Sequence, residues 1–262
     1  MKEKLTVVKI GGQVIDEEQA LDLFLESFSR LEGHKILVHG GGKMASALAE
    51  QMNIPQQMLN GRRVTDEASL KIITMVYAGW INKNIVARLQ ARHCDAVGLS
   101  GADGNLIQAH KRPVKEVDFG FVGDIDKVHT DLLCSFLDRG NSLVIAPLTH
   151  DGKGSLLNTN ADSVANSIAV ALADRYAVQL VYCFEKPGVL KDSTDESSCI
   201  RSIDKPGALK MEQEGTIHSG MLPKIHNALQ ALDAGVHKVV IGKWDKLEEL
   251  VSGVSGTQIQ EG

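Results

Sequence analysis

The sequence is poor in cysteine, lacks a long hydrophobic run and has no excess of positive charge. Its four cysteines show no C-x-x-C spacing, which favours reduced thiols in a cytoplasmic protein. The amino-terminal apolar run, Leu5 to Ile10, is too short for a signal peptide, and no segment approaches a membrane span. A net charge of −5 argues against nucleic-acid binding, because no basic stripe would displace counterions. The expected partner is a small molecule.

Several signatures of known chemistry are also missing. The chain has no H-E-x-x-H, no metal-spaced cysteine and histidine cluster, and no G-x-S-x-G nucleophile motif. A glycine run is present, but it is no Walker A loop, because Lys43 is followed by Met44 where serine or threonine is required. It also lacks the G-x-G-x-x-G dinucleotide spacing. These absences leave other phosphate chemistry open.

What stands out is the stretch from Lys35 to Met44, KILVHGGGKM. A buried strand, Ile36 to Val38, runs into three consecutive glycines and then into a helix expected from Lys43 to Met52. Such a turn directs backbone N–H groups and the helix dipole at one spot, which favours an anion. One glycine pair would be explained by an ordinary tight turn, but three in a row favour an anion site.

Two lysines occupy positions that call for an anion. Lys9 interrupts a buried strand just before Gly11 and Gly12, so it either extends to solvent or meets a negative charge. Lys224 follows a proline in the first turn of a helix, where the helix dipole disfavours a cation. Between them lies LNTNAD, Leu157 to Asp162, just before a helix of small residues. Asn160 is a natural N-cap there, and Asp162 gains modestly from the dipole.

The order of elements predicts an α/β fold with parallel strands and ligands at their carboxyl ends. A hairpin is expected over residues 57–65, with Arg62 and Arg63 available to clamp a carboxylate. A helix from Asp66 to Ala91 has an apolar face broad enough to pack against a second subunit. Two lysines, an aspartate and several glycine turns together fit phosphoryl transfer, which needs N–H groups and cations around phosphate oxygens.

Five motifs in order resemble the amino acid kinase family, and within it the N-acetyl-L-glutamate kinases. They cover almost the whole chain: VVKIGG at 7–12, VHGGG at 38–42, NGRRVTD at 60–66, LNTNAD at 157–162 and GMLPK at 220–224. The resemblance implies a three-layer αβα sandwich with a mainly parallel eight-stranded sheet. It also implies an acylglutamate-binding lobe over residues 1–174 and an ATP-binding lobe over residues 175–262.

The resemblance further implies a set of roles for this site. Lys9 and Lys224 would hold the γ-phosphoryl group in transfer and contact ATP, and Asp162 would orient both lysines. Gly11 and Gly12 would bind the β- and γ-phosphates.

On the acceptor side, Gly41 and Gly42 would donate N–H groups to the carboxylate and the group in flight. Arg63 and Asn158 would bind the substrate's α-carboxylate and acylamide, under a lid formed by the hairpin around Asn60. Mg²⁺ would be held by ATP oxygens, with no protein carboxylate cage. The implied product is an acyl phosphate on the γ-carboxylate, a step of arginine biosynthesis.

Three departures from the family pattern are visible. Arg62 stands where a small apolar residue is expected, with Lys111 and Arg112 as further cations. The usual acidic turn before the ATP site is replaced by Phe184-Glu185-Lys186-Pro187, which leaves the nucleotide contacts there open. The first strand begins at Leu5, without the amino-terminal helix of the family's arginine-inhibited hexamers, so an arginine-insensitive homodimer is expected.

Alternatives remain at the level of sequence. Arg62 could meet the third carboxylate of N-succinyl-L-glutamate, an alternative substrate to N-acetyl-L-glutamate. NGRRVTD and LNTNAD argue against kinases of aspartate, glutamate, carbamate or UMP. An alternative of another class is a silent nucleotide sensor, although unneeded lysines at these positions would be costly.

Overall fold

The computed structural model describes residues 2–59, 61–214 and 221–260. Its central element is an eight-stranded sheet in the order β12-β14-β13-β11-β1-β2-β8-β5. The sheet is parallel except between β13 and β14. The strands of this sheet are β1 (Lys4–Ile10), β2 (His34–His39), β5 (Ala96–Leu99), β8 (Ser142–Ile145), β11 (Ala177–Phe184), β12 (Ser202–Ile203), β13 (Lys238–Lys243) and β14 (Thr257–Ile259).

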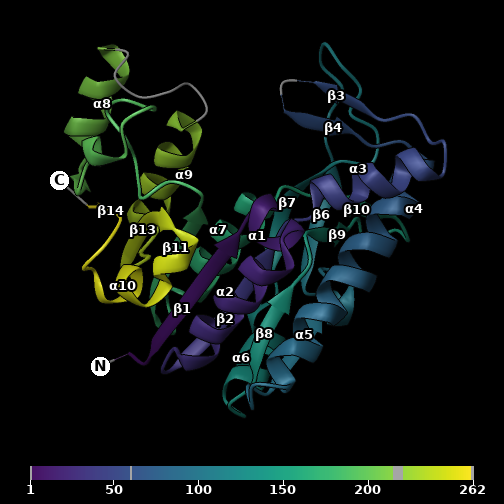
Figure 1. Ribbon diagram of the computed structural model, residues 1–262. Coiled ribbons are helices and arrows are strands. Elements are labelled where there is room, and N and C mark those ends of the chain that lie inside the picture. The colour runs from purple at the N-terminus through teal and green to yellow at the C-terminus, as the bar shows by residue number, and fades with distance from the viewer. Residues whose placement is uncertain (1, 60, 215–220, 261–262) are drawn as a thin grey trace.

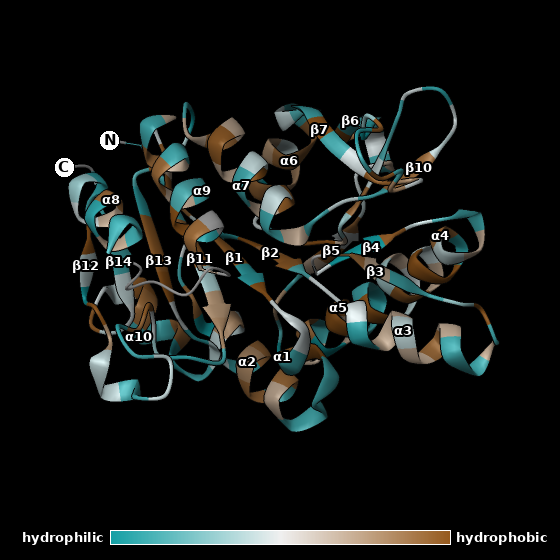
Figure 2. Ribbon diagram, turned by 90° about the horizontal axis from the view of Figure 1, so that it is seen from above, coloured by the Kyte–Doolittle hydropathy of each residue, from teal (hydrophilic) through white to brown (hydrophobic). Residues whose placement is uncertain are grey.

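Helices cover both faces of the sheet, so the predicted three-layer αβα sandwich is confirmed (Figures 1 and 2). One apolar core lies under α6 (Thr130–Leu137), α7 (Ala161–Leu172), α8 (Lys205–Gln213) and α9 (Leu222–Asp233). The other lies under α1 (Gly12–Asp16), α2 (Glu18–Arg30), α3 (Gly42–Gln51), α4 (Glu67–Thr74), α5 (Asn82–Gln90) and α10 (Leu247–Ser252). Strands buried on both faces explain the continuous apolar runs seen in the sequence.

Alternation along β1 decides which core each side chain enters. Leu5 and Val7 belong to the core beneath α7 and α9, whereas Val8 and Ile10 belong to the core beneath α2. Lys9 therefore shares the face of Leu5 and Val7. β1 also lies in the middle of the sheet, between β11 and β2, so the lysine is carried into the centre of the molecule.

Two smaller sheets stand beside the carboxyl ends of the main strands. One contains β10 (Leu156–Asn158), β9 (Leu148–His150), β6 (Ile107–Lys111) and β7 (Gly123–Val128). The other is the predicted hairpin, β3 (Gln57–Leu59) with β4 (Arg62–Val64). Asn60, named for the lid, lies outside the described residues, as does Gly220 of the last motif.

The long helix expected from Asp66 to Ala91 is present but is not uniform. α4 and α5 are joined by a π-helical segment, Met75–Ile81, which no sequence pattern predicted. Short 3₁₀ turns occur at Asp103–Asn105, Glu196–Ser198 and Trp244–Lys246. Among the described residues, no helix combines the length and hydrophobicity needed to cross a bilayer.

Candidate active site

The two lysines singled out in the sequence meet at one carboxylate. Lys9 Nζ lies 2.8 Å from Asp162 Oδ1, and Lys224 Nζ lies 3.0 Å from Asp162 Oδ2. Three elements bring them together: the end of β1, the first turn of α7 and the first turn of α9. We call Lys9, Asp162 and Lys224 the lysine–aspartate cluster.

Burial makes the charges of this cluster matter. Lys9 is 8% exposed, although a lysine at a strand end could have extended into solvent. Burial alone would raise the pKa of Asp162, but the two ammonium groups outweigh it and lower that pKa. Burial also lowers the pKa of Lys224, against the opposing effect of Asp162. With both lysines protonated, the cluster carries one net positive charge, which is suited to an anion.

The start of α7 is fixed by the cap predicted for Asn160. Its side-chain oxygen accepts hydrogen bonds from the backbone N–H groups of Asp162 and Ser163, at 2.8 and 3.1 Å. Because Asn160 performs the capping, the carboxylate of Asp162 is free to pair with the lysines. Asn160 therefore caps the helix, whereas Asp162 binds the two lysines.

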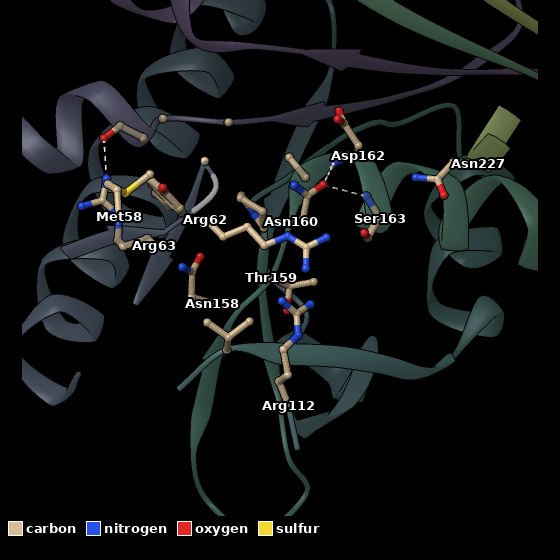
Figure 3. Close-up of a pocket in the computed structure, with 18 of the residues that line it drawn as sticks. Met58, Arg62, Arg63, Arg112, Asn158, Thr159, Asn160, Asp162, Ser163 and Asn227 are labelled. Carbon is tan, nitrogen blue, oxygen red and sulfur yellow. Dashed lines mark hydrogen bonds between the residues drawn. The ribbon is translucent and has the colours of Figure 1, made fainter. Parts of the chain in front are cut away.

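Beside the cluster lies a cavity of about 650 Å³ at the carboxyl ends of the strands (Figure 3). All five residues predicted to bind the acceptor line it, together with some that were not predicted. The lining includes Gly40, Gly41, Gly42, Arg62, Arg63, Tyr77, Arg112, Pro147, Asn158, Thr159, Asp162, Lys224 and Asn227. This volume is sufficient for a small organic substrate.

The glycine turn after β2 approaches the π-helical segment closely. A Cβ added to Gly41 would lie 2.3 Å from Ile81 Cδ1 and 3.0 Å from the ring of Tyr77. Only glycine fits there, and α3 begins directly after it. Tyr77 lines the cavity as well, but its position in an apolar helix gave no sign of this in the sequence. The π-helical segment accounts for it, since such segments often occur at functional sites.

Most of the hydrogen bonds of Arg63 go to other protein groups around the cavity. It is 8% exposed, and its Nη2 donates to the carbonyl of Gly42 at 2.9 Å and to Ser46 Oγ at 2.8 Å. Its Nη1 donates to the side chain of Gln56. A guanidinium group has about five N–H donors, and these contacts use three of them, which leaves two for a substrate. Arg63 therefore ties the β3–β4 hairpin to the glycine turn.

Asn158 and the remaining arginines line the other side of the cavity. Asn158 Nδ2 donates to Thr65 Oγ1 at 3.0 Å, which orients the amide and leaves its oxygen as an acceptor. Figure 3 shows the side chains of Arg62 and Arg112 directed toward one another across the cavity. Arg112 already holds Asp124, with Nε and Nη2 contacts of 3.1 and 2.5 Å to Oδ1.

The glycines predicted for the nucleotide, Gly11 and Gly12, lie outside the lining of the acceptor cavity. A Cβ on Gly11 would lie 3.5 Å from Lys9 Nζ, so the glycine turn after β1 borders the cluster directly. Gly12 is the first residue of α1 and does not line the described cavity. The sequence predicted neither the ring of Phe184 beside both lysines nor Asn227, one turn after Lys224 on α9. The one sequence feature that pointed to Phe184 was the departure of Phe184-Glu185-Lys186-Pro187 from the family pattern.

Comparison with known proteins identifies relatives of this chain. The amino acid kinase family model matches residues 4–243. The chain is 51% identical to an acetylglutamate kinase of Phocaeicola vulgatus over 261 residues, covering 100% of both chains. It is 50% identical to an acetylglutamate kinase of Bacteroides thetaiotaomicron, again covering 100% of both.

Solved structures share the fold. An N-acetylglutamate synthase from Neisseria gonorrhoeae, complexed with coenzyme A and N-acetyl-glutamate, aligns with a TM-score of 0.82 at 24% identity. The alignment covers 99% of this chain and 60% of that chain. The chain therefore belongs to the amino acid kinase family.

Proposed function

We propose that this protein transfers the γ-phosphoryl group of ATP to the γ-carboxylate of N-acetyl-L-glutamate, yielding an acyl phosphate. The observation that carries this proposal is the largely buried lysine–aspartate cluster, which borders both the glycine turn after β1 and the acceptor cavity. The full-length identity of about half to acetylglutamate kinases supports this choice of substrate. The name of those relatives implies a place in arginine biosynthesis.

In the proposed mechanism, Lys9 and Lys224 hold the group in transfer between donor and acceptor oxygens. Charge on those oxygens is shared or increases in the transition state, and two fixed ammonium groups stabilise it without reorganisation. Asp162 keeps the two lysines at a set separation. No proton transfer by the protein is required, because the acceptor carboxylate is already ionised at neutral pH.

The acceptor would lie in the cavity. N–H groups of Gly41 and Gly42 would meet the γ-carboxylate, and the free donors of Arg63 would meet the α-carboxylate. The oxygen of Asn158 would accept from the acylamide N–H. Support comes from the lining of the cavity and from the contacts that hold Arg63 and Asn158 in place.

The nucleotide would lie on the side of Gly11 and Gly12, where a side chain at Gly11 would crowd Lys9 Nζ. We infer that Mg²⁺ would come with the ATP and would partly neutralise the charge of its phosphates. We also propose that residues 1–174 bind the acylglutamate and residues 175–262 bind ATP. The cavity lining supports this division, because among the residues that the structure describes only Lys224 and Asn227 of the lining come from beyond residue 174.

We further propose a homodimer. The face of α4, α5 and the π-helical segment exposes Trp80 (64% exposed) and Met75 (49% exposed), side chains that a partner subunit would cover. A cytoplasmic location is also proposed, because Cys94, Cys134, Cys183 and Cys199 are all free.

The test is hydroxylamine trapping of acyl phosphate with ATP and Mg²⁺, comparing N-acetylglutamate, N-succinylglutamate, glutamate and aspartate. We expect a signal with N-acetylglutamate. The relatives do not favour the succinylated substrate, and a signal with that substrate alone would overturn the acyl assignment. Binding of ATP without product from any acceptor would favour the silent sensor.

A further inference from the structure

Phe184 is an unassigned aromatic residue beside the lysine–aspartate cluster. It ends β11, and its half-buried ring stacks on Tyr182 with a centroid separation of 6.3 Å and an interplanar angle of 15°. Lys224 Nζ lies over the ring of Phe184, 4.1 Å from its centroid, and Lys9 Nζ lies over it at 5.4 Å. Both distances fall inside the range of about 6 Å in which an aromatic face attracts a cation.

The charges of the cluster favour an aromatic ring at this position. One carboxylate, Asp162, faces two ammonium groups, so the partly buried cations are only half neutralised. An arriving phosphate would supply the missing negative charge. Without it, the electron-rich face of an aromatic ring is a further favourable neighbour for both cations.

Resting on the proposed phosphoryl transfer, we propose that Phe184 is a positioning residue whose ring holds the ammonium groups of Lys9 and Lys224 beside it, ready for the incoming phosphoryl group. The ring does not contact the reacting atoms. It limits the positions of two flexible side chains, and such positioning is where a phosphotransferase obtains much of its rate. Stacking on the buried Tyr182 keeps the ring itself from turning away.

The first arm of the test needs no turnover. With ¹³C-labelled lysine, the ε-CH₂ signal of Lys224, assigned by a Lys224→Arg variant, should show an upfield ring-current shift in the wild-type protein. Phe184→Leu should remove that shift, and Phe184→Tyr should keep it. A Lys224 signal that is the same in wild type and Phe184→Leu overturns the proposal.

The second arm is kinetic. Phe184→Leu should lower kcat/KM for ATP roughly tenfold, which is the expected size of a partly desolvated cation–π contact. The loss of activity at alkaline pH should begin about one pH unit lower, because a lysine without the ring loses its proton more readily. Among the described residues, the titratable groups that act on Lys224 are Asp162 on α7 and Lys9 on β1, and Asp162 in turn acts on Tyr182 of β11. Phe184→Tyr should restore both values.

Two further variants separate the aromatic face from simple packing. Phe136→Leu changes another partly buried aromatic of the same core, away from the lysines, and should leave the pH profile unchanged. Trifluorophenylalanine at position 184 keeps the shape of the ring and weakens its electron-rich face, so it should behave like Phe184→Leu even if the leucine variant folds poorly.

The outcomes distinguish this proposal from the proposed function. If the wild-type protein forms no acyl phosphate, the function fails while the lysine signal still tests the ring. If the wild type is active but trifluorophenylalanine leaves kcat/KM and the alkaline limb unchanged, the positioning role of Phe184 is overturned.

Discussion

At the scale of single residues, the site depends on charges that are buried before any ligand arrives. Lys9 and Lys224 share Asp162, and the pKa of that carboxyl is lowered because the two ammonium groups outweigh its burial. Removing one member of such a group leaves the others imperfectly paired. The consequences can be tested separately on rate and on stability.

Lys9→Ala should reduce kcat/KM roughly 10²- to 10³-fold, by analogy with loss of a single donor that stabilises a transition-state anion. Acyl phosphate trapping provides the measurement. Lys4→Ala is a matched control, because Lys4 begins the same strand and is exposed. Equal turnover in the Lys9 and Lys4 variants would remove Lys9 from the mechanism.

His39 predicts a pH dependence of stability. The residue is fully buried at the end of β2, where Nδ1 donates to the carbonyl of Gly40 at 2.8 Å and Nε2 faces Asn82 Nδ2 at 3.3 Å. Burial lowers its pKa from 6.5 to about 4. Between those values the unfolded chain binds the additional proton, so stability falls as pH falls through this window.

Through His39, the free energy of unfolding should fall by about 2 kcal/mol between pH 7 and pH 5. Urea unfolding of the wild type and of His39→Asn at both pH values isolates it, because asparagine does not titrate. Its amide can still donate to Gly40. If both proteins lose the same stability over this interval, the buried neutral histidine is not the cause.

At the scale of elements, the π-helical segment and the glycine turn after β2 form one structural unit. Gly41 fits only because it has no side chain where Ile81 and Tyr77 approach. α3 begins at the next residue, and Arg63 donates to the carbonyl of Gly42 from the β3–β4 hairpin. The segment, the turn and the hairpin therefore position the acceptor cavity together.

Gly41→Ala should destabilise the protein by about 2 to 3 kcal/mol, through overpacking against Ile81 and Tyr77 and through strain at φ 152°. Adding Ile81→Val removes Cδ1, the nearest atom, and should recover about 1 kcal/mol. Denaturant midpoints measure both effects. Gly140→Ala is the control for backbone strain alone, because φ is 84° there and no atom lies within 4 Å. Additive effects of the Gly41 and Ile81 changes would contradict the contact.

The elements also show what the sequence can and cannot predict. Local patterns predicted the central strands, the N-cap at Asn160 and the β3–β4 hairpin. They also predicted Lys9 at the end of a strand and Lys224 in the first turn of a helix. They did not predict the π-helical segment, because no local pattern marks it and its neighbour Gly41 lies far away in the sequence. Phe184 was noticed only as a departure, since no local rule places a strand-end ring beside lysines from two other elements.

At the scale of the whole molecule, the sheet collects the site from distant parts of the chain. β1, α7 and α9 are far apart in sequence, yet their ends meet at the carboxyl edge of the sheet (Figure 1). This is the edge at which parallel α/β sheets bind ligands. The long helix beside the hairpin exposes Met75 and Trp80 and is therefore available for contact with a partner.

We expect the proposed homodimer to depend on that helix. Trp80→Glu places a charge where an apolar side chain would be covered, so it should shift the protein from dimer to monomer in light scattering at micromolar concentration. A stable interface of standard size buries about 800 Å² per partner, and loss of one central tryptophan is enough to weaken it greatly. Val254→Glu is the matched control, because Val254 is similarly exposed, at 70% against 64% for Trp80, but lies outside this helix. A dimer that survives Trp80→Glu and dissociates with Val254→Glu would move the interface to the carboxyl-terminal region. A wild-type protein that scatters as a monomer would contradict the dimer itself, without affecting the site built within one chain.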